Sequence, residues 1–311
     1  MHYTGTIWRP PYEASSLLLE VTAGCTHHKC KFCTLYADLP FSFRLSPWED
    51  IESDLQEAQM LCCNAAVQAA SRLLGRARPQ KPRRVFLTGE NPFVLSTDKL
   101  LRLAEMIRRY LPWVESIDCF ARITDITPKT DDELRALRRA GYDRLTIGME
   151  TGDDAALTFM HKGYCAADIL RQCSRLEQAG IAYAVFYLTG ISGRGKGVEG
   201  AAATAEMLNQ LHPFLVGPNM LTIYPESELY REIQHGAWAE ESETEKYKEL
   251  RALVQGLTIE TEFAAMGASN AFQLYGHLPQ DRGKLLAAVD AILAKAGEEE
   301  LRAYREHLPH L

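Results

Sequence analysis

The chain has 311 residues, of which 46% are hydrophobic and 24% charged, with a formal net charge of -7. A mean hydropathy of -0.21 and the lack of an apolar run of about 18 or more residues argue against a membrane span. The acidic balance argues against nucleic acid as a partner, because nucleic-acid binding needs a basic surface. Eight cysteines are too few for a disulfide scaffold and the first residues lack a signal-peptide pattern, so we expect a soluble protein of the reducing cytoplasm.

The first predicted element is a strand at residues 16–22, and a cysteine-rich loop follows it directly. Cys25, Cys30 and Cys33 lie on this loop with the spacing Cys-x4-Cys-x2-Cys. Three thiolates can hold three irons of a [4Fe–4S] cluster, and a missing fourth cysteine leaves one iron open. A zinc site with a neighbouring histidine is the alternative, because Cys30 and Cys33 have zinc-like spacing. Since no second Cys/His pair follows at zinc-finger spacing, the pattern favours iron–sulfur.

A helix is predicted to begin at Pro47, because Ser46 before it is a good N-cap and proline suits the first helical position. It extends to about residue 74, and a basic loop at 75–84 follows. We interpret this loop as a solvated connection, with a docking patch for an acidic electron donor, a flavodoxin or ferredoxin, as the alternative. The basic residues are Arg72, Arg76, Arg78, Lys81, Arg83 and Arg84.

From residue 85 onward, short apolar strands alternate with amphipathic helices. The predicted strands cover residues 85–88, 114–120, 144–149, 181–188 and 214–223, and the helices cover 97–110, 131–140, 165–179 and 198–211. Together with the first strand, this order is typical of a parallel sheet with helical crossovers, so we predict an α/β fold, a partial (β/α)6 parallel barrel. The barrel with its lead-in takes residues 1–230, and a mainly helical extension takes 231–311.

Glycines and polar residues follow the predicted strands of this sheet, where parallel α/β folds bind their ligands. The residues at these strand ends are Gly89, Glu90, Asn91, Arg122, Gly148, Glu150, Gly152, Gly190, Ser192 and Tyr224. A glutamate after a strand is usually a solvated turn. Here, however, glutamate and glycine recur at the carboxyl ends of several predicted strands, on the same edge of the sheet as the three cysteines. This recurrence favours a cofactor site.

These motifs resemble those of the radical S-adenosylmethionine (SAM) superfamily. The cysteine loop with Phe32 before its third cysteine, the Gly89-Glu90 pair and the segment 144–152 follow the order of that family's cluster, amino-group and ribose motifs. The resemblance covers about residues 9–230 and is to barrels of the oxygen-independent coproporphyrinogen oxidase type. The family's usual spacing is Cys-x3-Cys-x2-Cys, so this loop carries one extra residue, which we expect a flexible loop to accommodate.

The resemblance implies that the three thiolates hold a [4Fe–4S] cluster and that SAM chelates the open iron. One electron then cleaves SAM to a 5′-deoxyadenosyl radical that abstracts hydrogen from a substrate. It implies that Glu90 accepts hydrogen bonds from the SAM ammonium, that Gly89 allows close approach of the backbone, and that Glu150 accepts from the ribose hydroxyls.

Further contacts to the cofactor follow from the same resemblance. Lys162 is expected to face the SAM carboxylate, with a surface lysine as an equal alternative. Arg122 is expected to bind SAM or an acidic substrate, with pairing to Asp125 as the alternative. Phe32 and Tyr224 are expected to line the cluster and the adenine, and Asn91 belongs to the same set of contacts.

In the extension, we predict helices at 243–255, 281–296 and 298–308 and a strand at 257–263. The loop at 267–283 either packs under the barrel or forms a lid that offers Asn270 and His277 to a substrate. We expect a small-molecule substrate. The alternatives are an RNA- or protein-modifying enzyme of the same chemistry, and a non-catalytic protein that binds iron–sulfur or zinc.

Overall fold

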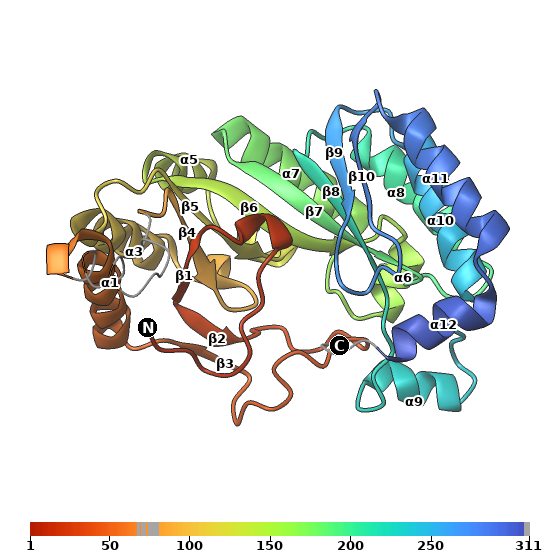
Figure 1. Cartoon of the computed structure of the whole chain (residues 1–311), viewed down its shortest axis with the longest axis horizontal. Helices are drawn as coiled ribbons and strands as arrows, with labels where there is room; N and C mark the ends of the chain where they lie inside the picture. Colours follow the sequence, from red (N-terminus) through yellow and green to blue (C-terminus); the bar gives the residue numbers. More distant parts are fainter. Residues whose placement is uncertain (67–68, 70–72, 74–80, 308–311) are drawn as a thin grey trace. The chain divides into compact units, whose positions relative to one another are not determined.

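The computed structural model describes all residues except 67–68, 70–72, 74–80 and 308–311. Its strands form an eight-stranded sheet of order β1-β4-β5-β6-β7-β8-β9-β10 and a two-stranded sheet of β2 and β3 (Figure 1). The strands are β1 (Leu17–Glu20), β2 (Thr22–Gly24), β3 (Phe43–Leu45), β4 (Arg84–Thr88), β5 (Ser116–Ala121), β6 (Tyr142–Glu150), β7 (Ala182–Thr189), β8 (Leu215–Met220), β9 (Thr261–Ala265) and β10 (Leu274–Leu278). The predicted α/β class is confirmed.

The chain folds into two compact units, and the first comprises Met1–Thr26, Leu35–Thr146 and Ala179–Ile181. Here β1 pairs in parallel with β4, and β4 with β5. Helix α3 packs against α1 and α5. The short lead-in helix η1 precedes β1, and η2 and α4 follow β4 and β5. The helical elements are η1 (Pro11–Glu13), α1 (Trp48–Cys63), η2 (Pro92–Val94), α3 (Thr97–Tyr110), α4 (Ile123–Ile126) and α5 (Asp131–Arg139).

Two predictions for the first unit need correction. The hydroxyl of Ser46 does not cap α1 but donates to Glu20, 3.3 Å away, and the helix begins one residue later than predicted, at Trp48. At its other end, α1 ends at Cys63, and Asn64 interrupts the predicted helix. Beyond it, the described residues 65, 66, 69 and 73 are again helical. Most of the remaining predicted range lies outside the described residues.

The basic residues predicted as a possible docking patch are only partly described. Arg72, Arg76 and Arg78 lie outside the described residues. Arg83 pairs with Glu115 at 2.6 Å, and Arg84 lies 3.6 Å from a carboxylate oxygen of Glu13. Both interpretations of the loop, as a solvated connection and as a docking patch, stay predictions.

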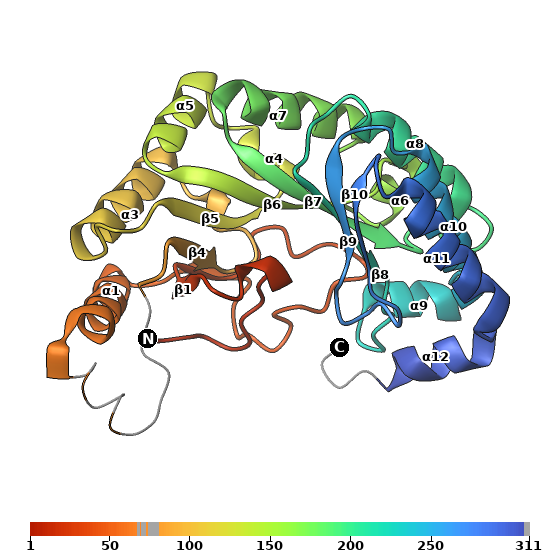
Figure 2. The same ribbon diagram turned by 45° about the horizontal axis from the view of Figure 1, so that its top comes forward.

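The second unit comprises His27–Thr34, Ile147–Gln178 and Ala182–Leu311. In it β7 pairs in parallel with β8, and β8 with β9. Helix α10 packs against both α8 and α11, and the three helices lie side by side in both ribbon views (Figure 2). The helices are α6 (Asp154–Phe159), α7 (Ala166–Ala179), α8 (Gly197–Leu208), α9 (Glu228–Gln234), α10 (Glu243–Gly256), α11 (Arg282–Lys295) and α12 (Glu298–Glu306).

The predicted loop at 267–283 is wrong in part, because it contains a strand. β10 pairs antiparallel with β9, with Leu274 opposite Ala265 and Leu278 opposite Thr261. Buried Leu274, Gly276 and Leu278 alternate with exposed residues, which is the pattern of a strand with one buried face. The C-terminal extension therefore adds two strands to the sheet as well as the predicted helices.

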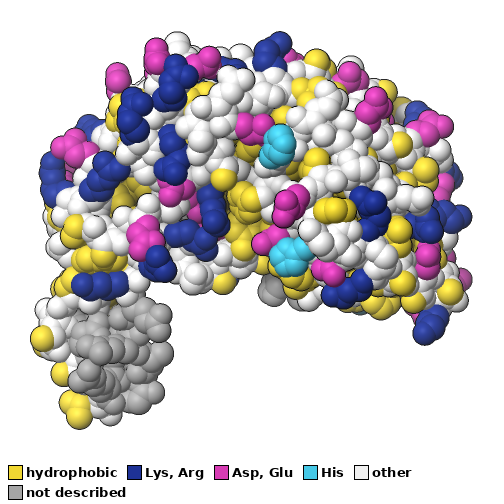
Figure 3. Space-filling model, turned by 90° about the horizontal axis from the view of Figure 1, so that it is seen from above, with side chains coloured by type: hydrophobic (Ala, Val, Ile, Leu, Met, Phe, Trp, Pro, Cys, Tyr) yellow, Lys and Arg dark blue, Asp and Glu magenta, His cyan; other side chains and the backbone are white. Residues whose placement is uncertain are grey.

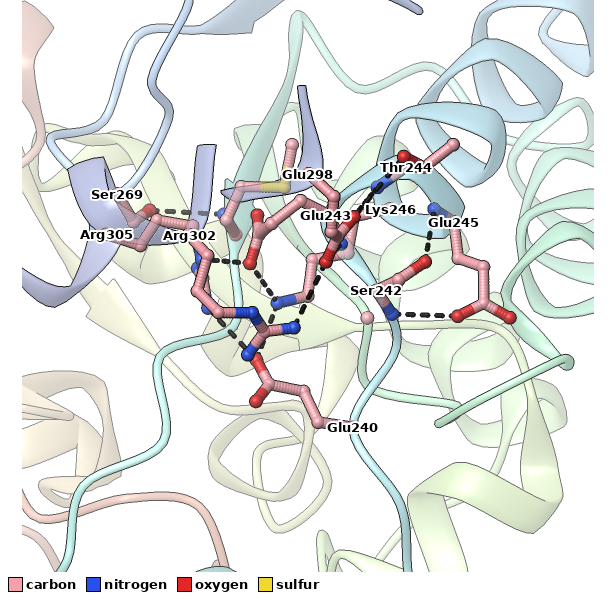
Figure 4. Close-up of polar contacts among 12 residues, drawn as sticks. Glu240, Ser242, Glu243, Thr244, Glu245, Lys246, Ser269, Glu298, Arg302 and Arg305 are labelled. Atoms are coloured by element: carbon pink, nitrogen blue, oxygen red, sulfur yellow. Dashed lines mark hydrogen bonds and ion pairs between the residues drawn. The ribbon is translucent and has the colours of Figure 1, made fainter. Parts of the chain in front are cut away.

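A buried ion-pair network fastens α12 to α10 (Figure 4). Lys246 is fully buried, and its Nζ lies 2.6 Å from Glu240 and 3.1 Å from Glu243. Arg305 of α12 donates to Glu243 at 2.7 Å. The carboxylate of Glu298 accepts from the backbone N–H groups of Glu243 and Thr244, each at 2.9 Å, and so caps the first turn of α10. Removing one partner would leave a buried charge unpaired, so this network specifies how the extension packs.

The described helices lack the combination of length and apolar character that crossing a bilayer needs. On the face seen from above, Lys and Arg side chains lie interspersed with Asp and Glu (Figure 3).

Candidate cofactor site

The first cysteine is held by the antiparallel pair of β2 and β3. The backbone N–H of Cys25 donates to the carbonyl of Ser42 at 2.8 Å. Gly24 before it has φ +81, and a Cβ at this position would lie 2.2 Å from the same carbonyl oxygen. Only glycine fits here, so the sequence Gly24-Cys25 sets the direction in which the loop leaves β2.

Asn91 and Arg122 form a buried group with Asp125. Asn91 is fully buried, and its Nδ2 donates to the hydroxyl of Thr26 at 2.8 Å and to Asp125 at 3.1 Å. The backbone N–H of Arg122 donates to the other oxygen of Asp125 at 2.8 Å. Burial raises the pKa of Asp125 to about 6, and the bonds from Arg122 and Asn91 oppose that rise. Asn91 thus fixes the residue after Cys25, and Arg122 meets Asp125 through its backbone N–H. The role of the Arg122 side chain stays a prediction.

Gly89 is required by the packing of its own strand end. Its φ is +119, and a Cβ would lie 2.0 Å from the hydroxyl and 2.6 Å from the carbonyl oxygen of Thr22. Glu90 follows and is half-buried. Within the described residues, the buried hydroxyls of Thr22 and Thr88 make no hydrogen bond. Unsatisfied buried polar atoms beside Gly89 and Glu90 fit a site that receives a polar ligand such as SAM.

Cys30 and Cys33 belong to the second compact unit, unlike Cys25. All three are reduced thiols, with Cys33 exposed and the other two half-buried. Burial raises the pKa of the Tyr224 hydroxyl, and the charge of Cys33 raises it further. No three Cys, His, Asp or Glu side chains in the described part of the chain are gathered as a ready metal site. Reduced thiols fit a cluster by their chemistry, and ligand sets commonly assemble only when the metal binds.

Glu150 and Lys162 point at each other in the second unit. The Nζ of Lys162 donates to Oε1 of Glu150 at 2.9 Å, and it lies 5.7 Å from the ring centre of Phe32 and 5.5 Å from that of Tyr164. Lys162 is 3% exposed, so the interpretation as a surface lysine is wrong. The sequence prediction had paired both side chains with SAM and had not paired them with each other.

The backbone at Glu150 is unusual. Its φ of +69 lies in the left-handed region that side chains other than glycine rarely adopt, and such strain commonly marks functional positions. Gly148 makes room for it, because a Cβ at Gly148 would lie 2.9 Å from Oε1 of Glu150. The hydroxyl of Tyr164 donates to the carbonyl of Gly148 at 2.7 Å and fixes this strand end. Tyr164 was missed in the sequence because it lies outside any strand end.

A family model described as "Radical SAM superfamily" matches residues 19–196, which is more than half of the chain. The chain belongs to the radical SAM superfamily. The heme chaperone HemW of Bacillus subtilis (strain 168) is 23% identical over 220 residues, which are 68% of this chain and 57% of HemW.

Solved structures agree with the family assignment at the level of the fold. Coproporphyrinogen III oxidase (HemN) from Escherichia coli gives a TM-score of 0.54 at 16% identity, covering 77% of this chain and 51% of HemN. Methylornithine synthase (PylB) gives 0.51 at 15% identity, covering 93% and 85%. The radical SAM fold is thereby confirmed. The chain spans little more than half the length of HemW and about half that of HemN.

Family membership decides between the two metals that the cysteine spacing had left open. Radical SAM proteins use a [4Fe–4S] cluster and SAM, so these are the cofactors of this chain and the zinc alternative is wrong. The family's members are enzymes that need a reductant and a substrate. The roles of individual residues stay predictions.

Proposed function

We propose that this protein is an enzyme in which Cys25, Cys30 and Cys33 bind the cluster and Glu90, Glu150 and Lys162 bind SAM. When bound, the cluster and SAM supply a 5′-deoxyadenosyl radical, which we propose takes a hydrogen atom from a small-molecule substrate. One observation supports this most: Glu150, Lys162 and Phe32 lie together in the unit that also holds Cys30 and Cys33. A protein that only stored a metal would need the cysteines but not this buried carboxylate–lysine pair.

The proposed roles of the chain's residues follow from their chemistry. An ionised carboxylate has two oxygens and about four acceptor positions, so Glu150 can bind Lys162 through one oxygen and ribose hydroxyls through the other. Lys162 has three N–H donors and can therefore contact a SAM carboxylate while it holds Glu150. Glu90 accepts from the SAM ammonium. Phe32 and Tyr224 exclude water from the reacting groups.

A reductant must supply the electron, and we propose a flavodoxin- or ferredoxin-type donor. A cytoplasmic setting suits this role, because thiolates and an exposed cluster need reducing conditions. The C-terminal extension at residues 231–311 is proposed to cover the substrate. Its Asn270 donates to the carbonyl of Pro218 at 3.0 Å, and Ser269 accepts from the N–H of Met220 at 3.1 Å, so the segment is fastened to β8.

Anaerobic reconstitution with iron and sulfide, followed by reduction with dithionite in the presence of SAM, tests the proposal. We expect stoichiometric iron and sulfide and formation of 5′-deoxyadenosine, measured by liquid chromatography. A metabolite extract should increase the yield and reveal the substrate. A protein with a full cluster that forms no 5′-deoxyadenosine would contradict the enzymatic function.

A heme chaperone is the second candidate, because HemW is 23% identical over 68% of this chain and bears that name. The two functions differ in what they do with SAM and heme. A chaperone would bind heme and pass it to an acceptor protein without forming 5′-deoxyadenosine. Heme titration monitored by the Soret band, run beside the cleavage assay, separates the two.

A further inference from the structure

Lys31 lies between Cys30 and Cys33, and its side chain is almost completely buried. The residue is 7% exposed. Its Nζ pairs with Glu232 and lies 3.8 Å from Glu228, two carboxylates one turn apart on α9. The Lys31 ammonium is the largest influence that lowers the pKa of Glu232. A buried ammonium is costly unless it is paired, so this side chain has one favourable place in the fold.

The backbone of Lys31 is fixed on both sides as well. Its carbonyl accepts from the N–H of Leu229 in α9 at 2.7 Å, and its N–H donates to the carbonyl of Met160 after α6 at 3.2 Å. The ammonium also lies 4.3 Å from the ring centre of Phe159. The backbone N–H and the backbone carbonyl of Lys31 are thus both hydrogen-bonded to residues far away in the sequence.

This anchor constrains the two cysteines beside it. Cys30 and Cys33 are linked by a turn in which the N–H of Cys33 donates to the carbonyl of Cys30 at 3.1 Å. Because Lys31 lies inside that turn, a shift of the turn's backbone would break the bonds to α9 and Met160. A second contact holds the start of the segment, where a ring nitrogen of His27 meets the carbonyl oxygen of His161.

We propose that Lys31 is a positioning residue for the cluster: its ion pair with Glu232 and its backbone bonds fix Cys30 and Cys33 in the geometry that retains iron. The inference rests on the proposed ligation by these cysteines. It makes α9, which lies about 200 residues further along the chain, part of the cluster's support. Partners of this kind beyond the direct ligands typically change metal affinity about 10–100-fold.

Variants of Lys31 and Glu232 test the proposal, and Lys29 offers a matched control. Lys31→Met keeps the aliphatic chain and removes the charge, Glu232→Gln removes the partner's charge, and Lys31→Arg keeps the pair. Lys29→Met removes a lysine that is exposed and lies on the same loop. Three measurements apply: hydrogen exchange of residues 27–34 in the cluster-free protein, iron and sulfide content after reconstitution, and the rate of cluster loss to a chelator followed by absorbance.

We expect Lys31→Met and Glu232→Gln to speed hydrogen exchange in residues 27–34 and to release the cluster about tenfold faster than the wild type. The double variant should add little to either single one, because both remove the same pair. Lys31→Arg and Lys29→Met should behave as the wild type. Wild-type rates of exchange and cluster loss in Lys31→Met would overturn the inference. A wild-type protein that takes up no iron and sulfide would overturn the proposed function itself, which is a distinct result.

Discussion

The Nζ of Lys162 lies 2.9 Å from Oε1 of Glu150, and both side chains are largely buried, at 4% and 14% exposure. The contact joins the end of β6 to the segment after α6, so the two groups predicted to bind the ribose and the carboxylate of SAM hold each other in place. If Glu150 binds the ribose as proposed, a lysine that orients its carboxylate contributes to SAM affinity even where it does not touch SAM.

Lys162→Met is expected to weaken SAM binding by about tenfold or more, because it leaves the Glu150 carboxylate without its partner. Equilibrium dialysis with the anaerobically reconstituted protein measures this. Lys162→Arg keeps the charge and should retain most of the affinity. Iron content should be the same in both variants, and SAM binding at wild-type strength in Lys162→Met would refute the role of the pair.

Each of the three loop cysteines is expected to be necessary for the cluster. Cys30→Ser should lower iron and sulfide to background and abolish the cluster's absorbance, because serine is a poor iron ligand at neutral pH. Cys63→Ser is the control, since Cys63 is an exposed thiol at the end of α1. Equal iron content in the two variants would show that Cys30 is not a ligand.

The sequence was sufficient for the features that depend on local spacing. Alternating strands and helices predicted the parallel sheet, and the three cysteines predicted the cofactor. Contacts between distant residues were not predictable, because Lys31 and Glu232 lie 201 positions apart and no local pattern links them. The strand β10 was missed because Gly276 on its buried face and Tyr275 on its exposed face weaken the apolar alternation.

Gly89 was predicted for a different reason from the one that the structure gives. The sequence suggested close approach of SAM, whereas the structure shows that Thr22 occupies the place of a Cβ. A substitution at Gly89 should therefore destabilise the fold whether or not SAM binds beside it. The stability of such a variant has to be measured before its activity.

Gly89→Ala is expected to lower the free energy of unfolding by about 2–4 kcal/mol, from the left-handed φ of +119 and the overlap with Thr22. Urea unfolding followed by circular dichroism measures the change. Gly283→Ala is the control, because no atom lies within 4 Å of a Cβ at that position. If both variants unfolded at the same urea concentration, Thr22 would not constrain Gly89 as described.

Asp118 is a buried acid in β5 whose ionisation is unfavourable. It is 2% exposed, its Oδ1 accepts from the hydroxyl of Ser116, and its Oδ2 makes no hydrogen bond within the described residues. Burial raises the pKa of Asp118 from 3.8 to about 7, and nearby Glu13 adds to the rise while Arg144 opposes it. The folded state therefore holds a proton that the unfolded chain releases near pH 4.

Stability should consequently fall as the pH rises from about 4 to about 7, because a group with a raised folded pKa stabilises the fold only while it is protonated. At about 1.4 kcal/mol per pKa unit, the loss reaches at most about 4 kcal/mol. Asp118→Asn does not titrate, so its urea midpoint relative to the wild type should rise between pH 5 and pH 8. Asp132→Asn, whose carboxylate is 92% exposed, should show no such trend. A difference between Asp118→Asn and the wild type that stays constant across this pH range would mean that Asp118 is ionised in the folded protein throughout.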